Sequence, residues 1–346
     1  MRARAMDAME RWRSALGRAG GGFWTCAILA VALGACTDAT DVERLEISAS
    51  GAVAGQAYLD LNGNETADGP DDPVADASVV LTAAAGGTSV IETETDAEGL
   101  FVFEEVPVGT YTVTLAEDVL GDSLLAVDEA EPFQVTMDTA NEVVLGATYP
   151  ELPIEEVREA EPGRRVFTSG IALNPRQSFS DGRVFLEGEE AYLQATDVGR
   201  TPAVAVGDSV RFLGRTARRD GRPALDDVTP IILIPQARVP VPREISTGDA
   251  ATAGGGPLDA ALVRIRSAEV SDTMTVEATG DFHFTADDGS GPVEVVLRAF
   301  LGFPVQPDEE DVVSQAVGLL APYDDGSGNV RWRLLVRSAS EFGLEP

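Results

Sequence analysis

The sequence has 346 residues, with 58 acidic residues against 25 basic ones, all arginine, and a formal net charge of −33. A surface of this sign repels phosphate backbones and anionic headgroups, which argues against general nucleic-acid binding or electrostatic attachment to a membrane. One histidine and two cysteines are too few for a zinc site or a disulfide framework.

Residues 1–35 are typical of a secretory signal peptide. Five arginines precede the apolar run "FWTCAILAVALGA" (23–35), which is shorter than the roughly 20 residues that a spanning helix needs. "LGAC" (33–36) resembles the bacterial lipobox, whose cysteine becomes the lipidated first residue of the mature chain. We therefore expect lipidation of Cys36, a lipid anchor in the bacterial cell envelope and, because Thr37 follows, location at the outer membrane or cell surface.

After a predicted tether over 36–50, residues 51–149 alternate apolar and polar side chains in short runs separated by turn residues. This pattern is typical of an antiparallel β-sandwich. Its expected core residues are Phe101, Phe103, Tyr111, Val113 and Leu115. "TDAEGLFVFEEVPVGTYTV" (95–113) resembles the signature of prealbumin-like modules, which include carboxypeptidase regulatory-like domains and Sdr-type B repeats. The resemblance implies a prealbumin/Ig-like fold and a stalk-like or adhesive role.

The loop "LDLNGNETADGPDD" (59–72) crowds acids and amides between two predicted strands. It resembles the calcium loop of the Sdr-type modules, and calcium binds six to eight oxygen ligands. The implied ligands are Asp60, Asn62, Asn64, Thr66 through its carbonyl, Asp68 and Asp71. Glu65 stands where that family has a glycine, which makes a sharp turn costlier. A solvated acidic turn is the alternative, and calcium is the cofactor that the sequence suggests.

Residues 150–245 and 246–346 are predicted to form tandem OB-like barrels, so the expected fold class is all-β. "VGDSVRFLG" (206–214) resembles the Gly-Asp turn and curved strand of such barrels. A looser second copy places Gly318 where the first has Gly214. The pair resembles the region ahead of the catalytic domain in some secreted nucleases, although the nuclease domain itself is not found in this sequence.

No constellation of residues in the sequence demands catalysis. His283 lies in an alternating strand pattern, "DFHFTADD", and is the one histidine that a Ser-His-Asp triad could use. Phosphate-binding and dinucleotide-binding loops are also lacking. We therefore expect a protein that is not an enzyme.

Arginines and a tryptophan on two corresponding barrel segments are the candidate ligand-binding residues. They are Arg211, Arg218, Arg219, Arg331, Trp332 and Arg333. A single strand of nucleic acid could use them for backbone contacts and stacking, but neighbouring acids argue against that partner. We expect a lipid-anchored protein that binds or scaffolds an extracellular protein or glycan. The alternative is an OB-type subunit, for nucleic acid or glycan, that assists an extracellular hydrolase or nuclease.

Overall fold

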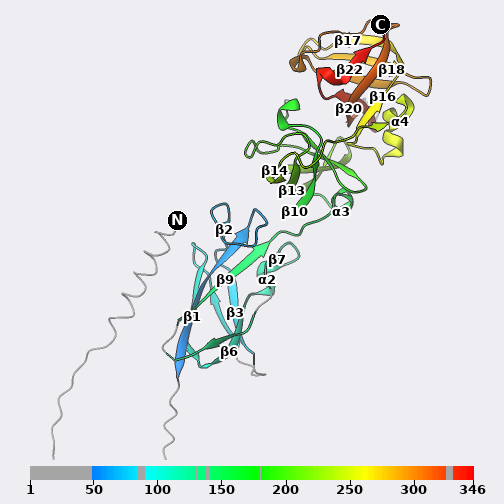
Figure 1. Ribbon diagram of the computed structural model, residues 1–346. Coiled ribbons are helices and arrows are strands. Elements are labelled where there is room, and N and C mark those ends of the chain that lie inside the picture. The colour runs from blue at the N-terminus through cyan, green and yellow to red at the C-terminus, as the bar shows by residue number, and fades with distance from the viewer. Residues whose placement is uncertain (1–48, 85–89, 129–130, 138–139, 180, 325–329) are drawn as a thin grey trace, which may run out of the picture.

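The computed structural model describes residues 49–84, 90–128, 131–137, 140–179, 181–324 and 330–346. Cys36 and most of the predicted tether lie outside these residues. A β-sandwich and two β-barrels follow one another along the chain and along the long axis of the molecule (Figure 1). The predicted all-β class is confirmed.

The sandwich consists of two facing sheets. The first contains β1 (Ser50–Asp60), β2 (Asp72–Pro73), β5 (Leu100–Pro107), β7 (Leu125–Ala126) and β9 (Ala140–Thr148). The second contains β3 (Ser78–Ala83), β4 (Val90–Glu94), β6 (Gly109–Leu115) and β8 (Phe133–Val135), and the short helix α2 (Glu117–Leu120) follows β6. One pairing differs from the predicted antiparallel arrangement, because β1 and β9 run parallel. All the other strands of the sandwich lie between β1 and β9 in the sequence, so the last strand can enter from the same end as the first.

The predicted aromatic residues form the core of the sandwich. Phe101, Phe103 and Tyr111 are all buried, as are Val113 and Leu115. The rings of Phe101 and Phe103 lie edge to face, with their centroids 6.0 Å apart. Their alternation along β5 and β6 sends these side chains to the inner face, as the sequence pattern predicted.

The first barrel is closed by five strands in the order β10-β11-β12-β14-β13. Their bounds are β10 (Arg165–Ala172), β11 (Val184–Glu187), β12 (Tyr192–Ala195), β13 (Ser209–Arg219) and β14 (Arg222–Ile234). Helix α3 (Ile154–Glu159) packs beside it with Ile154 and Val157 buried, and the 3-10 turn η1 (Arg176–Ser178) follows β10. Parallel pairing of β12 with β14 closes the barrel.

The second barrel repeats this topology. Its strands are β15 (Arg243–Glu244), β16 (Leu262–Ile265), β17 (Ala268–Thr275), β18 (Phe282–Asp287), β19 (Val293–Leu297), β20 (Val312–Asp324), β21 (Val330–Val336) and β22 (Phe342–Leu344). The helical segments are α4 (Thr247–Thr252), η2 (Ala253–Gly255), η3 (Ala299–Leu301) and η4 (Ala339–Glu341). The parallel pair β19–β21 corresponds to β12–β14, and the antiparallel pair β20–β21 corresponds to β13–β14.

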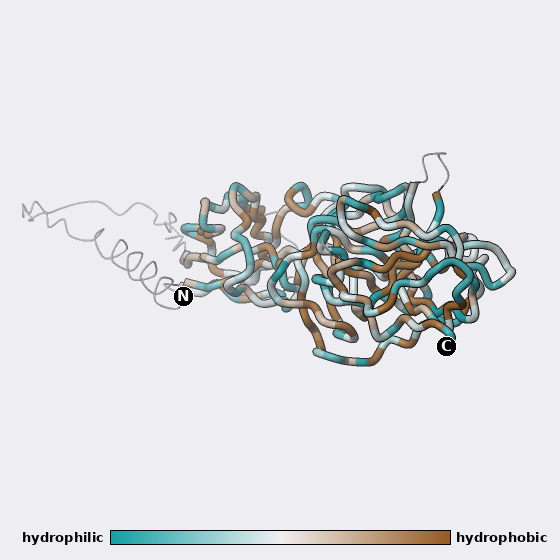
Figure 2. Tube along the Cα trace, turned by 90° about the horizontal axis from the view of Figure 1, so that it is seen from above, coloured by the Kyte–Doolittle hydropathy of each residue, from teal (hydrophilic) through white to brown (hydrophobic). Residues whose placement is uncertain are grey.

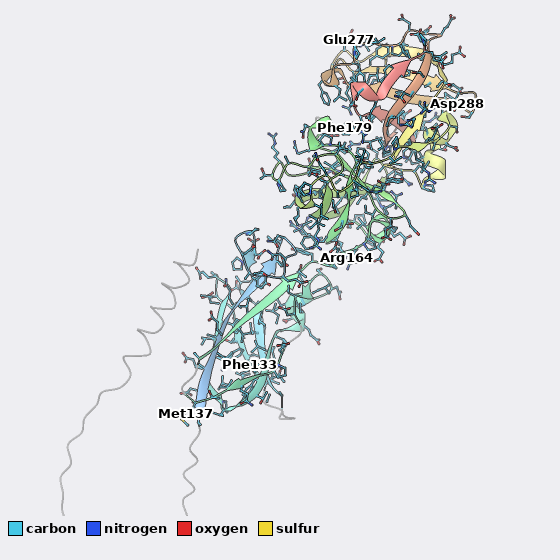
Figure 3. The ribbon with its side chains drawn as sticks, viewed as in Figure 1. Phe133, Met137, Arg164, Phe179, Glu277 and Asp288 are labelled. Atoms are coloured by element: carbon cyan, nitrogen blue, oxygen red, sulfur yellow. The ribbon has the colours of Figure 1, made fainter. Side chains whose placement is uncertain are left out.

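An apolar cluster joins the two barrels. Phe179 and Phe185 of the first barrel pack with residues from the outer face of the second, including Val296 and Leu335. All four are almost completely buried, and Phe179 is labelled at this contact in Figure 3. Hydrophobic segments run through the middle of the barrel region in Figure 2. Because this cluster is as buried as the barrel cores, the two barrels pack as one unit.

Candidate functional site: the acidic loop and the arginine hairpins

Asp60 and Asp71 hold the acidic loop through its backbone. The carboxylate of Asp60 is buried and accepts N–H bonds from Asn62, Gly63 (2.6 Å) and Glu65 (2.9 Å). The carboxylate of Asp71 accepts from the N–H groups of Leu61 and Asp68, at 3.0 and 2.9 Å. A tight loop leaves such N–H groups without strand partners, so these acids satisfy them.

The remaining predicted ligands contact one another. The side-chain amides of Asn62 and Asn64 donate to Asp68 at 3.1 and 2.9 Å, and the Thr66 N–H donates to the Asn64 amide oxygen. Glu65 adopts the left-handed conformation, with φ of 59°, that a glycine would adopt at lower cost. The loop therefore keeps its sharp turn despite the substitution.

The ligand types of the loop fit calcium, since all are carboxylate, amide or carbonyl oxygens. Across the described ranges, however, no three His, Cys, Asp or Glu side chains gather closely enough to hold a metal ion. The carboxylates of Asp60 and Asp71 accept from backbone N–H groups instead, and that of Asp68 accepts from side-chain amides. To coordinate an ion, Asn62 and Asn64 would have to turn their amide oxygens toward it.

Arg211 joins the acidic loop to the first barrel. Its Nη1 donates to the Gly63 carbonyl at 2.8 Å, and its Nη2 lies 3.0 Å from a carboxylate oxygen of Glu151. The guanidinium also lies over the ring of Phe167, 5.8 Å from its centroid. This predicted ligand residue is thus used at the junction between sandwich and barrel.

The β13–β14 hairpin carries the other two predicted arginines of this barrel. Arg218 donates to the carbonyl of Arg158 at 3.1 Å, and Arg219 pairs with Asp226 and, at 3.7 Å, with Asp197. Burial raises the pKa of Asp226, but the Thr196 hydroxyl and Arg219 outweigh it and leave that pKa below its usual value. These arginines balance neighbouring acids on the barrel.

Trp332 lies inside the barrel region, with 9% of its surface exposed. Its indole N–H donates to Asp259 at 2.8 Å, and Arg222 covers the ring at 5.3 Å from the centroid. The other carboxylate oxygen of Asp259 contacts Arg222 at 3.2 Å and Arg158 at 3.4 Å. The ring is therefore held by neighbouring side chains, whereas the sequence suggests Trp332 as a ligand-binding residue.

Arg158, Arg222 and Asp259 were not among the predicted site residues. Asp259 lies 73 residues before Trp332 and 101 after Arg158. No local spacing in the sequence therefore predicts the cluster. The sequence shows only an acid at the end of the Gly/Ala-rich segment before β16, and its burial is known from the structure alone.

A hollow on the second barrel brings other predicted residues together. It has a volume of about 530 Å³, and Glu294, Tyr323, Arg331 and Trp332 are among its lining residues. Arg333 lies beside it, 5.1 Å from the centroid of the Tyr323 ring. The hollow thus offers an aromatic ring, a carboxylate and a guanidinium to a polar ligand.

The carboxylate of Glu294 is held at the wall of this hollow. Its Oε1 lies 2.5 Å from Nδ1 of His283. Burial raises the pKa of Glu294, but the hydrogen bond with His283 and the nearby Arg333 leave it below its ordinary value. His283 is thus partnered, and Glu294 stays ionised near neutral pH.

The sandwich matches a known family. Residues 66–142 match the carboxypeptidase regulatory-like domain. The predicted resemblance to this class is confirmed for that module, which covers less than half of the chain. No curated protein matches the sequence.

Solved structures that match show only low structural similarity. A murine DNA-binding protein bound to double-stranded DNA is 11% identical, with 54% of this chain and 98% of that chain covered and a TM-score of 0.27. A proposed carbohydrate-binding protein from Pseudomonas aeruginosa is 17% identical, with 29% and 89% covered and a TM-score of 0.18. The TIE protein of Bacillus anthracis is 8% identical, with 84% and 49% covered and a TM-score of 0.24. Similarity this low supports no inference about function.

Among the described residues, no helix is long and apolar enough to cross a membrane.

Proposed function

We propose that this protein is a non-enzymatic, lipid-anchored envelope protein in which the sandwich holds the paired barrels away from the membrane. The observation that supports this proposal is the pair of built junctions between its modules. Arg211 ties the acidic loop to the first barrel, and the cluster around Phe179 and Phe185 joins the barrels. Modules connected in this way keep a fixed separation, as a spacer requires.

The anchor is tested by Cys36→Ser. We expect the wild-type chain in the membrane fraction with a mass that includes acyl chains. The variant should appear in the soluble fraction or as the uncleaved precursor. A wild-type mature chain whose mass lacks lipid, with membrane retention unchanged in the variant, would contradict the proposal.

The partner that we propose for the barrels is an extracellular glycan or protein segment, bound at the hollow beside Tyr323. An aromatic face next to a carboxylate and a guanidinium suits a ring bearing several hydroxyl groups. Tyr323→Ala should abolish binding of glycans that the Cys36→Ser protein retains on a glycan array. Tyr149→Ala, which removes a tyrosine near the sandwich–barrel boundary, is the matched control. Equal losses in both variants would place the binding elsewhere.

The second candidate is a nucleic-acid-binding subunit that assists an extracellular enzyme. It is favoured by the number of arginines on the β13–β14 hairpin and opposed by their pairing with acids. Single-stranded DNA should then bind at low salt, lose affinity steeply as salt rises, and bind less well to Arg218→Ala/Arg219→Ala. Absence of binding at low salt would eliminate this candidate.

We also propose that the acidic loop binds calcium, which would stiffen the sandwich where it meets the first barrel. The left-handed conformation of Glu65 favours this, because it supplies the turn that the resembling calcium loops make with glycine. The ion would supply positive charge among Asp60, Asp68 and Asp71.

A further inference from the structure

The sandwich has a groove between its two sheets that none of the proposed sites uses. The groove has a volume of about 1110 Å³, lies between β6 and β9, and has Asp128 and Glu131 among its lining residues. Its apolar wall includes Val113, Leu115, Phe133, Val143 and Leu145. Phe133 is labelled in Figure 3. The groove therefore combines this apolar wall with polar lining residues that include Thr114, Glu117 and Asp128.

An unpaired strand edge borders this groove on the first sheet. β9 pairs with β1 along its whole length, whereas β7 pairs only with Ala147 and Thr148. The Gly146 carbonyl accepts from the Val127 N–H, so it points away from β1. Residues two apart on a strand direct their backbone groups to the same side, so those of Glu142 and Val144 also point away from β1. Within the described residues no strand pairs with that edge of β9 before Ala147.

The facing edge of the second sheet is also short of partners. β8 pairs with β6 only from Gly109 to Tyr111. Pro132, next in register, has no N–H to continue the ladder. The backbone groups of Val113 and Leu115 therefore also lie along the groove. Edges of this kind accept an added strand from another chain.

The charge around the groove decides what kind of strand fits. Glu117, Asp128 and Glu131 line it, and Glu142 lies on the open strand. Residues 45–157 contain no arginine, lysine or histidine. A cationic segment is attracted by this field and an acidic one is repelled.

We propose that the groove binds an extended, cationic polypeptide segment of a partner protein, which adds as a strand along the open edge of β9. Backbone hydrogen bonds to Glu142 and Val144 provide the pairing. Alternate apolar side chains of the segment enter the groove beside Val113 and Leu115, and its basic side chains meet the acidic rim. This site lies in the sandwich and is independent of the proposed hollow on the second barrel.

The test uses residues 36–346 carrying Cys36→Ser and a ten-residue peptide of alternating valine and arginine. We expect binding that weakens as salt rises, with slower amide exchange at Glu142 and Val144. A peptide of alternating valine and glutamate should not bind. The same composition arranged as a valine block and an arginine block should bind much more weakly, because it cannot alternate. Equal binding of the alternating and block peptides would overturn the proposal.

Two variants separate strand addition from general attraction. Val144→Pro removes the outward N–H while leaving the neighbouring pairing of β9 with β1, and should weaken binding at least about tenfold. Glu117→Gln/Asp128→Asn/Glu131→Gln should weaken it more than Glu92→Gln/Glu94→Gln, a control pair on the exposed strand β4. The proposal would be overturned if the rim and control variants lost peptide affinity equally and Val144→Pro bound the peptide as well as the parent chain.

Other occupants give distinct results. Peptide binding that appears only after deletion of residues 37–48 would assign the groove to the chain's own preceding segment. If the Val144 amide exchanges more slowly at higher protein concentration in the absence of peptide, the groove binds a second copy of the chain. Either result overturns a separate cationic partner.

Discussion

Asp259 links the two barrels through its side chain. Its buried carboxylate accepts from Trp332 of the second barrel and pairs with Arg158 and Arg222 from the first. These partners stabilise the ionised form of the buried acid. Its removal leaves the indole N–H without an acceptor and two partly buried arginines without their carboxylate.

Asp259→Ala should lower the free energy of unfolding by about 3 kcal/mol, because breaking a buried pair strands its partner. Trp332 is the one tryptophan after residue 35, so the emission of a chain made of residues 36–346 reports this site alone. Urea unfolding followed by this emission measures the loss. Glu189→Ala, at an exposed position, is the control, and an equal shift in both would contradict the assignment.

Glu294 should contribute to acid sensitivity. Its pKa lies below the ordinary value of 4.5 in the folded chain. Its stabilising contribution is therefore present above pH 4.5 and is lost as the pH falls through that value toward the folded pKa. Glu294→Gln should unfold with a flatter dependence on pH below about 4.5. Parallel stability curves for variant and wild type would contradict this.

At the scale of elements, two glycines let long strands bend around their barrels. A Cβ at Gly214 would lie 2.7 Å from the Leu225 side chain, and one at Gly318 would lie 2.4 Å from the Leu335 carbonyl oxygen. The pairing of β13 with β14 also shifts register beside Gly214. Each strand thus approaches its neighbour too closely for a side chain.

Gly318→Ala should be more harmful than Gly214→Ala. A backbone carbonyl within a sheet cannot rotate away, whereas the Leu225 side chain can change rotamer. We expect losses of roughly 3 and 1 kcal/mol, the range for overpacked sites. Thermal unfolding of the two variants side by side measures the difference, and the reverse order would contradict this account.

The acidic loop gives the second prediction at this scale. If it binds calcium, chelation should lower the melting temperature. Calcium at a hundredfold excess over its dissociation constant should add about 2.7 kcal/mol. Asp68→Asn should remove this response at little cost without the ion, since the Asp68 carboxylate accepts from the side-chain amides of Asn62 and Asn64. Asp60→Ala should also destabilise the ion-free chain, because three backbone N–H groups lose their acceptor.

Magnesium should substitute poorly in the same experiment, because it demands a tighter octahedral shell. Identical melting in chelator and in millimolar calcium would leave the loop as a hydrogen-bonded acidic turn.

At the scale of the whole molecule, the orientation of the sandwich depends on Arg211. Its hydrogen bond to the Gly63 carbonyl and its ion pair with the half-exposed Glu151 are individually worth only about 1 kcal/mol. Their loss should free the junction without unfolding either module.

Arg211→Ala should therefore broaden the distance between spin labels placed at Glu92→Cys and Glu309→Cys in the Cys36→Ser chain, which has no other cysteine after residue 35. The wild-type junction should give one narrow distribution by pulsed electron paramagnetic resonance. Arg200→Ala, at an exposed position, is the control. A narrow distribution in the Arg211 variant would mean that other contacts fix the junction.

The sequence by itself determined the all-β class, the class of the sandwich and the equivalence of Gly214 and Gly318. These features rest on alternation, turn residues and short motifs, which are local. The aromatic core around Phe101 and Phe103 follows from the same alternation, because one face of a sandwich strand must be buried.

Only the tertiary structure decided which face of a strand lies inside and which distant residues meet. Alternation on β21 separates Trp332 from its arginine neighbours, but it does not say that Trp332 is the buried member. Asp259 reaches Trp332, and Arg211 reaches Gly63, across 73 and 148 residues. The parallel pairing of β1 with β9 is equally remote. Such contacts depend on how whole modules pack, and packing over that separation leaves no periodic trace in the sequence.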